Sequence, residues 1–182
     1  MLTVGPEVDK FSVQQRADSD ESRSDLALTI YKEKTCFVIG GSKTIFNSLS
    51  SVSRYNIVKD HWEPGTPALH LKRSLAAACC IGDSIFVFAG YDGSKHLNSV
   101  EKLNVPAIAS GQTGWELIEL PEEVFAPRIY PAVVPLNESE IAILGGSGGR
   151  AILSYVVIFN VATKDFRKVA DGGDYKFCSK SN

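Results

Sequence analysis

Short runs of continuously apolar residues recur along the chain, and each run ends in a pair of small residues, called a doublet here. The three runs and their doublets are residues 36–39 with Gly40 and Gly41, residues 85–88 with Ala89 and Gly90, and residues 141–144 with Gly145 and Gly146. The second members of the doublets are 49 and 56 positions apart. A short apolar run bounded by turn residues is typical of a strand covered on both faces, so the pattern predicts one buried strand in each repeat.

Three further markers recur in the same register as the doublets. A lone aromatic residue recurs with gaps of 51, 53 and 51 positions, at Phe11, Trp62, Trp115 and Phe166. An arginine precedes each second doublet residue by 18, 17 and 18 positions, at Arg23, Arg73 and Arg128. A segment that closes in asparagine follows each doublet, at residues 52–56, 100–104 and 156–160. Four independent markers with one period indicate an internal repeat.

Each period is predicted to fold as four short strands. The first strands are residues 75–81 and 132–136, which are rich in small or β-branched side chains, and Gly82 with Asp83 supplies a hairpin turn after the former. The third strand alternates polar and apolar residues, and the fourth carries the lone aromatic residue. Residues 75–80 are rich in alanine, so a helix is the alternative there. Pro131 and Pro135 in the equivalent segment of the next repeat favour a strand instead.

The glycine doublet, Tyr55 with Asn56 on the third strand and Trp62 six positions later resemble the kelch family. The resemblance covers residues 23–169 and implies an all-β fold, in which each repeat is a four-stranded blade of a propeller. The sequence departs from the family pattern at a few positions. The second doublet is Ala89-Gly90, Phe166 replaces tryptophan, and Leu103 and Phe159 replace the third-strand tyrosine. These changes keep the size or apolar character of the side chains, so the blade prediction stands.

The repeats divide the chain into five segments. Residues 23–68, 69–122 and 123–170 are the three predicted blades, residues 1–22 hold Phe11 on one extra outer strand of a preceding blade and a polar connection, and residues 171–182 form a frayed tail. Propellers usually close with about 4–8 blades, so three blades predict an open arc, a partial propeller. An open arc leaves two unpaired edges. We therefore expect either a homodimer that completes a ring or a fragment of a longer chain.

Composition narrows the classes of partner. Lysine and arginine number 19 against 21 aspartate and glutamate, so the net charge of −2 favours no nucleic-acid partner. No apolar run approaches the roughly 20 residues of a membrane span, so we expect no membrane partner. The four cysteines, Cys36, Cys79, Cys80 and Cys178, contain no Cys-x-x-Cys pair, and the first three lie in apolar strand-like runs. This pattern favours a cytoplasmic protein with free thiols, no metal and no cofactor.

In proteins of the resembling family, the inter-blade connections and the loops after the doublets form one face where partners commonly dock. Residues 91–98 combine aromatic, charged and amide groups at a turn-rich tip and are the strongest candidate for such a contact. The candidate partner-binding residues are Arg73, Tyr91, Asp92, Lys95, His96, Arg128, Ser147 and Arg150. For the arginines the alternative is that they hydrogen-bond backbone carbonyls between blades. Tyrosine and arginine are enriched at interface hot spots, which favours binding at the Tyr91 loop and leaves both roles open for the arginines.

The leading functional hypothesis is a non-enzymatic protein–protein interaction module, and the resemblance implies a substrate-recruiting or cytoskeletal role. The glycine-rich segment 145–150 does not support a phosphate-binding loop, because a strand-like segment and not a helix follows it. No catalytic residue is assigned. The alternative is a small-molecule enzyme on a propeller of this type, acting on carbohydrates or resembling a copper-dependent oxidase.

Overall fold

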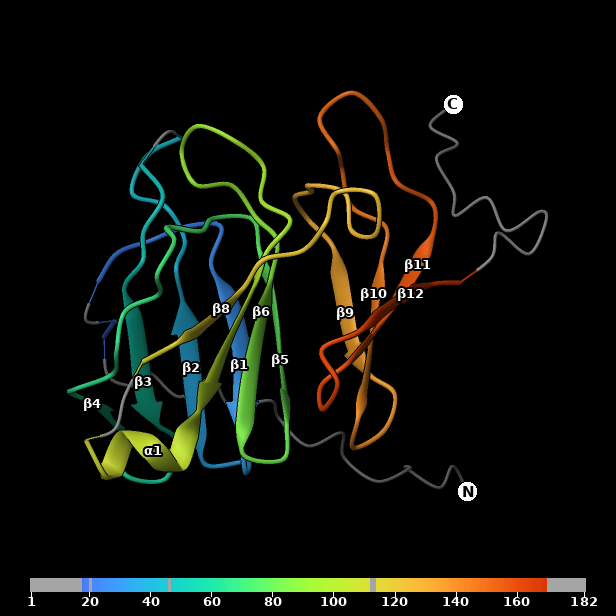
Figure 1. Cartoon of the computed structure of the whole chain (residues 1–182). Coiled ribbons are helices and arrows are strands. Elements are labelled where there is room, and N and C mark those ends of the chain that lie inside the picture. The colour runs from blue at the N-terminus through green and yellow to red at the C-terminus, as the bar shows by residue number, and fades with distance from the viewer. Residues whose placement is uncertain (1–17, 20, 46, 112–113, 170–182) are drawn as a thin grey trace, which may run out of the picture.

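The computed structural model describes residues 18–169 except positions 20, 46, 112 and 113. In this part of the chain, three four-stranded antiparallel sheets stand side by side (Figure 1). The strands within each sheet follow one another in chain order. The all-β prediction is confirmed, with one short helix added. The predicted outer strand at Phe11 and the tail at residues 171–182 lie outside the described residues.

The three sheets are named blades 1, 2 and 3 in chain order. Blade 1 contains β1 (Ala27–Tyr31), β2 (Thr35–Ile39), β3 (Val52–Asn56) and β4 (His61–Glu63). Blade 2 contains β5 (Ala77–Ile81), β6 (Ser84–Phe88), β7 (Val100–Asn104) and β8 (Glu116–Ile118). Blade 3 contains β9 (Ala132–Pro135), β10 (Glu140–Leu144), β11 (Val156–Asn160) and β12 (Phe166–Lys168). The first strands contact one another between blades, β1 with β5 and β5 with β9, so they are the inner strands of the arc.

The inner strands β5 and β9 have very different sequences but form equivalent strands. The alanine-rich residues of β5 form a strand, as predicted, because each pairs with β6. Pro135 lies at the end of β9, which pairs on one side only, with β10. Proline lacks an N–H group and is therefore tolerated on such an edge strand. The two inner strands thus keep the same role despite very different sequences.

Asparagine closes the third strand of each blade because its side chain holds the turn that follows. The side-chain oxygen of Asn56 accepts hydrogen bonds from the amides of Val58 and Lys59, at 3.1 and 2.9 Å. Asn160 accepts two such bonds in blade 3. In blade 2, Asn104 caps the unanticipated helix α1 (Val105–Ala109) by accepting from the amide of Ala107. The repeated asparagine therefore caps the segment after the third strand in every blade. In blade 2 the connection between β7 and β8 is longer and includes one helical turn.

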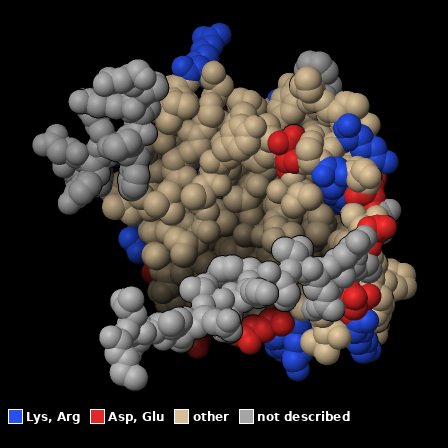
Figure 2. All heavy atoms as spheres, turned by 180° about the vertical axis from the view of Figure 1, so that it is seen from behind, with Lys and Arg blue, Asp and Glu red and all other residues tan. Residues whose placement is uncertain are grey.

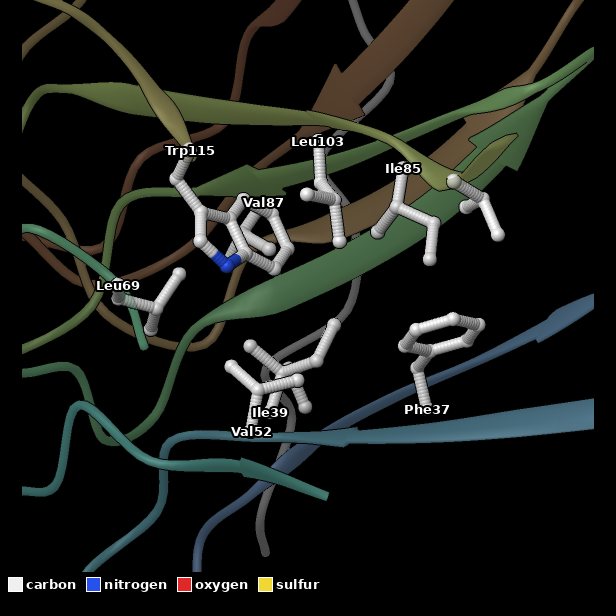
Figure 3. Packing of buried hydrophobic residues seen from close by; sticks show 10 residues of the cluster. Phe37, Ile39, Val52, Leu69, Ile85, Val87, Leu103 and Trp115 are labelled. Carbon is white, nitrogen blue, oxygen red and sulfur yellow. The ribbon is translucent and has the colours of Figure 1, made fainter. Parts of the chain in front are cut away.

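The core lies between the blades, because side chains on each strand alternate between its two faces. On β6, Ile85 and Val87 lie in the cluster shared with blade 1, whereas Phe86 and Phe88 lie in the cluster shared with blade 3. Figure 3 shows the first cluster, with Ile85 and Val87 pointing toward Phe37 of blade 1 and its neighbours. Each blade thus has a leading face toward the preceding blade and a trailing face toward the following one.

The repeated aromatic residue joins each blade to the connection before it. Trp115 is 3% exposed, and its indole N–H donates to the carbonyl of Pro67 at 2.9 Å. In blade 3, Phe166 lies beside Phe125 of the connection, with ring centroids 5.7 Å apart. A buried aromatic side chain removes about 150–250 Å² from water. These residues are therefore anchors between adjacent blades.

Main-chain hydrogen bonds also link the blades, and the same bonds recur at both junctions. The amide of Leu75 donates to the carbonyl of Asp25, and the amide of Tyr130 donates to the carbonyl of Leu75, both at 2.9 Å. All three residues have φ between 54° and 56°. The amides of the second doublet glycines donate to the carbonyls of the next repeat arginines, Gly41 to Arg73 and Gly90 to Arg128. Each blade junction therefore has one fixed backbone register.

Candidate functional site

The loops that follow the doublets gather at one end of the blades. These doublet loops are residues 42–51, 91–99 and 147–155, and they extend upward in the view of Figure 1. Isolated bridges tie each loop to the connection that precedes its blade, including Ser74 with Tyr91 and Ile129 with Ser147. The sequence-derived surface is therefore a continuous structural feature, called the loop face here.

Asp92 organises the doublet loop of blade 2. One of its carboxylate oxygens, Oδ1, accepts hydrogen bonds from the amides of Ser94 and Lys95, at 2.7 and 2.8 Å, and from the Ser94 hydroxyl. Partial desolvation opposes ionisation of Asp92, but the bonds from Lys95 and Ser94 outweigh it and hold the pKa below its usual value. The carboxylate therefore shapes the loop and leaves Lys95 exposed at its tip.

His96 brings the doublet loops of blades 2 and 3 together. Its ring meets the ring of Tyr91 edge to face, with centroids 5.9 Å apart. On the other loop it lies against Gly149, where a Cβ atom would come within 3.1 Å of the imidazole. Six of the eight predicted residues lie on these two adjoining loops, with Ser147 at the base of the second loop and Arg150 exposed beside Gly149.

Two cationic side chains lie on the loop face, and the Asp92 carboxylate interacts electrostatically with one of them, Lys95. Within the described residues, neither Lys95 nor Arg150 has an ion-pair partner, whereas Lys43 pairs with Glu21 at 2.8 Å. Seen from behind, acidic and basic groups are interspersed over one side of the molecule, and a basic side chain projects at the top, apart from any acidic group (Figure 2). The face thus offers two cationic groups without forming a broad basic field.

Sequence reasoning missed two apolar side chains on this face. Ile45 and Ile152 are 82% and 79% exposed, and they lie in the doublet loops of blades 1 and 3. A single apolar residue in a polar loop gives no periodic signal, although its position in a predicted surface loop could have identified it. Exposed apolar side chains on a surface that also carries an arginine are suited to contact with another protein.

Arg73 and Arg128 do not belong to this accessible surface, which corrects their assignment as partner-contacting residues. They are 1% and 0% exposed. The Arg73 guanidinium donates to the carbonyls of Ala89 and Ser99 at 2.8 and 3.1 Å. Arg128 donates to the carbonyl of Gly145 at 3.0 Å. The geometry therefore supports bonding to backbone carbonyls, although these carbonyls belong to the arginine's own blade and do not lie between blades.

The arginine bond to the doublet recurs in all three blades. Arg23 donates to the carbonyl of Gly40 at 3.1 Å, so each repeat arginine holds the first doublet residue of its own blade. Arg23 and Arg73 also hydrogen-bond a side chain of the third strand of their blade, and the residue type of that side chain differs. Arg23 meets the Ser53 hydroxyl, whereas Arg73 meets the carboxylate of Glu101. Glu101 is a buried residue that the sequence reasoning overlooked, because a charge on a strand that alternates polar and apolar residues gives no signal of burial.

The described residues hold no group of three histidine, cysteine, aspartate or glutamate side chains that could bind a metal ion. Cys36, Cys79 and Cys80 are free thiols, and burial raises the pKa of each. No helix in the described part of the chain is both long and apolar enough to span a membrane.

Comparison with known proteins agrees with the repeat and the blade geometry. A family model described as Kelch motif matches residues 72–106, which include β5, β6 and β7. This stretch of the chain therefore carries a kelch motif. The described part is a partial kelch propeller of three blades that does not close into a ring (Figure 1). The family prediction from the repeat markers is thus confirmed.

A relative supports the same conclusion over a limited stretch. Kelch-like protein 4 from Homo sapiens is 42% identical to this chain over 50 residues. The match covers 28% of this kelch-repeat chain and 7% of the human protein. The chain therefore corresponds to a small part of that relative.

Proposed function

We propose that this kelch-repeat chain binds a protein partner through its loop face and acts by binding and not by catalysis. The observation that carries the proposal is the exposure of Lys95, Arg150 and Ile152 on loops whose bases are tied to the blades by backbone bridges. Preformed loops limit the ordering that association requires, so more of the contact energy contributes to affinity. The match to the Kelch motif supports the same proposal.

The chemistry of the face favours an acidic partner segment that also carries an apolar side chain. Lys95 and Arg150 provide cationic groups without acidic partners among the described residues, and arginine can bind a carboxylate through two hydrogen bonds. Ile45 and Ile152 provide apolar surface nearby on the same face. Asp92 stays ionised because Ser94 and Lys95 donate to its carboxylate, so it reduces the net positive charge that such a partner meets beside Lys95.

A cytoplasmic setting is part of the proposal, and the free thiols of Cys36, Cys79 and Cys80 suit a reducing compartment. In such a setting the bound protein would be a recruited substrate or a cytoskeletal component. The outer blade faces would be covered by a further copy of the chain or by additional repeats.

Selection from a random peptide library displayed on phage, with the immobilised 182-residue chain as bait, tests the binding face. We expect enrichment of peptides that combine aspartate or glutamate with leucine, isoleucine or phenylalanine. The double change Lys95→Glu and Arg150→Glu should reduce capture of the enriched peptides at least ten-fold, which corresponds to about 1.4 kcal/mol.

Lys59→Glu is the matched control, because Lys59 is an exposed lysine in the turn between β3 and β4 and not in a doublet loop. Capture by this variant should equal that of the unchanged chain. Enrichment of basic or uncharged peptides, or equal loss in the double variant and the Lys59→Glu variant, would refute the proposed face.

A further inference from the structure

His96 lies where two doublet loops meet, with a cationic residue on each side. In its own loop it follows Lys95, which is exposed at the tip. Its imidazole packs against Gly149 of the blade 3 loop, where a Cβ atom would lie 3.1 Å from Cε1 of the ring. The residue after Gly149 is the exposed Arg150. The two cations of the loop face are therefore chain neighbours of the two residues in this contact.

The imidazole is held in place by packing and backbone pairing, and its nitrogens stay available. The His96 ring meets the Tyr91 ring at an interplanar angle of 74°. Isolated bridges pair Tyr91 with His96 and Leu97 with Arg128, so the backbone of the loop is fixed. In the described part of the chain no residue hydrogen-bonds to either ring nitrogen, and neither nitrogen is a buried polar atom without a partner. Both nitrogens therefore reach solvent, where one can take up a proton or meet an incoming acceptor.

The groups around the ring have fixed charges in weakly acidic solution. The charged and titratable groups on the two loops near His96 are Tyr91, Asp92, Lys95 and Arg150. Desolvation opposes ionisation of Asp92, but hydrogen bonds from Lys95 and Ser94 outweigh it and hold its pKa below the usual value. Tyrosine is uncharged at and below neutral pH, whereas lysine and arginine are cationic. The imidazole is therefore the group whose charge varies at this junction.

Arg128 is the charged residue of the third element packed here, because its segment pairs with Leu97 of the same loop. Its guanidinium turns inward, where Nη2 donates to the phenol of Tyr155 at 2.7 Å, and the residue is 0% exposed. It contributes no accessible cation. Two accessible cations and one carboxylate remain, which together give a net charge of +1 beside a neutral imidazole. Protonation of His96 raises this net charge to +2.

We propose that His96 is a proton-linked contact of the loop face, and that protonation of its imidazole strengthens binding of an acidic partner segment. This proton link rests on the proposed function and adds regulation by pH to it. Histidine ordinarily changes its charge between about pH 5 and pH 8. A carboxylate of the partner then accepts from the imidazolium N–H and also meets Lys95 and Arg150. Because linkage is reciprocal, the bound segment favours the protonated imidazole, and the complex takes up a proton.

Fluorescence anisotropy of a labelled acidic peptide tests the proton link. The probe is the most enriched histidine-free peptide of the phage selection that contains aspartate or glutamate, since its carboxylates stay ionised above about pH 5.5. We expect its dissociation constant to fall about three-fold from pH 7.5 to pH 5.5, as one added exposed charge pair permits. His96→Gln should bind as the unchanged chain does at pH 7.5 and lose the response to pH. His61→Gln, an exposed histidine on β4 outside the doublet loops, should keep it.

Calorimetric titration in buffers of different ionisation enthalpy measures the protons taken up on binding. At pH 6.5 the unchanged chain and His61→Gln should take up protons, whereas His96→Gln should take up none. A merely structural role of His96 would not produce this difference, and circular dichroism verifies that both variants are folded.

Equal or weaker binding at pH 5.5 would overturn the proton link and leave the proposed function intact. A pH response that persists in His96→Gln, or binding by the unchanged chain without proton uptake, has the same meaning. If no acidic peptide binds at either pH, the proposed function fails together with the proton link.

Discussion

Arg73 and Glu101 form an ion pair that is shielded completely from solvent. Their Nε and Oε1 atoms are 3.1 Å apart, and both side chains are 0% exposed. Glu101 also accepts hydrogen bonds from the amides of His70 and Leu71, at 2.7 and 3.1 Å. Through this carboxylate, β7 holds the connection that links blades 1 and 2. The ion pair is therefore part of the blade junction and not of the binding surface.

Replacing Arg73 by methionine should destabilise the protein by about 3–5 kcal/mol, because it leaves Glu101 charged and buried without its partner. The double variant Arg73→Met with Glu101→Leu should be less destabilised, since it buries no unpaired charge. Urea unfolding followed by circular dichroism gives the free energy of unfolding for each variant.

Arg54→Met is the control for this comparison, because Arg54 pairs with Glu63 at 2.9 Å but its side chain is 20% exposed. A pair nearer the solvent contributes only about 0–1 kcal/mol. Equal losses of stability for Arg54→Met and Arg73→Met would contradict the assignment of Arg73 as a buried structural residue.

The fold could be predicted because each repeat marker has a structural role, either in the backbone of a blade or in the packing between blades. The doublet glycine lies where a neighbouring carbonyl leaves no room for Cβ, the asparagine caps a turn, and Trp115 fills a junction. These needs recur in every blade, so they appear as a period in the sequence. Among the described blades, only blade 2 contains a helix, α1. Because this helix does not recur, no periodic pattern in the sequence could predict it.

The candidate site was predicted only in part, because the repeat register sets which loops share a face but not which way a long side chain turns. Tyr91 and His96 lie in one doublet loop and Arg150 in the next. Arg128 instead turns inward between the rings of Phe125 and Tyr155, 4.3 and 4.9 Å from their centroids. That orientation depends in part on Tyr155, which lies 27 positions away in the sequence, so local composition could not decide it.

The second doublet glycine should be far less tolerant of alanine than a turn glycine. At Gly90, with φ of 106°, a Cβ atom would lie 2.7 Å from the carbonyl oxygen of Ser74, whereas at Gly82, with φ of 54°, it would meet nothing within 4 Å. Positive φ costs an alanine about 1–3 kcal/mol at either position. Gly90→Ala adds a backbone clash at a blade junction, so its loss should exceed that of Gly82→Ala.

Thermal and urea unfolding of the two alanine variants measure this difference directly. Ala89, which occupies a φ of 57° naturally, shows that a methyl group alone is acceptable where space exists. If Gly82→Ala and Gly90→Ala proved equally stable, the close approach of Ser74 would not explain the second doublet glycine.

Alkaline pH should destabilise the protein partly through one buried thiol. Burial, with a smaller contribution from the neighbouring Cys80, raises the pKa of Cys79 from 9.0 to about 12. Above pH 9 the unfolded chain releases this proton while the folded chain retains it. Stability that is fully present below pH 9 is therefore lost as the pH rises toward 12, by about 1.4 kcal/mol per pH unit.

Comparison with Cys79→Ala isolates this effect from the titration of lysines and tyrosines. The variant leaves a small cavity whose cost does not depend on pH, so the stability advantage of the unchanged chain over the variant should be constant up to about pH 8. Between pH 8 and pH 10 that advantage should shrink by about 1.4 kcal/mol. Urea unfolding at the two pH values measures it, and an advantage that stayed constant or grew would show that Cys79 ionises as readily in the folded protein as in the unfolded chain.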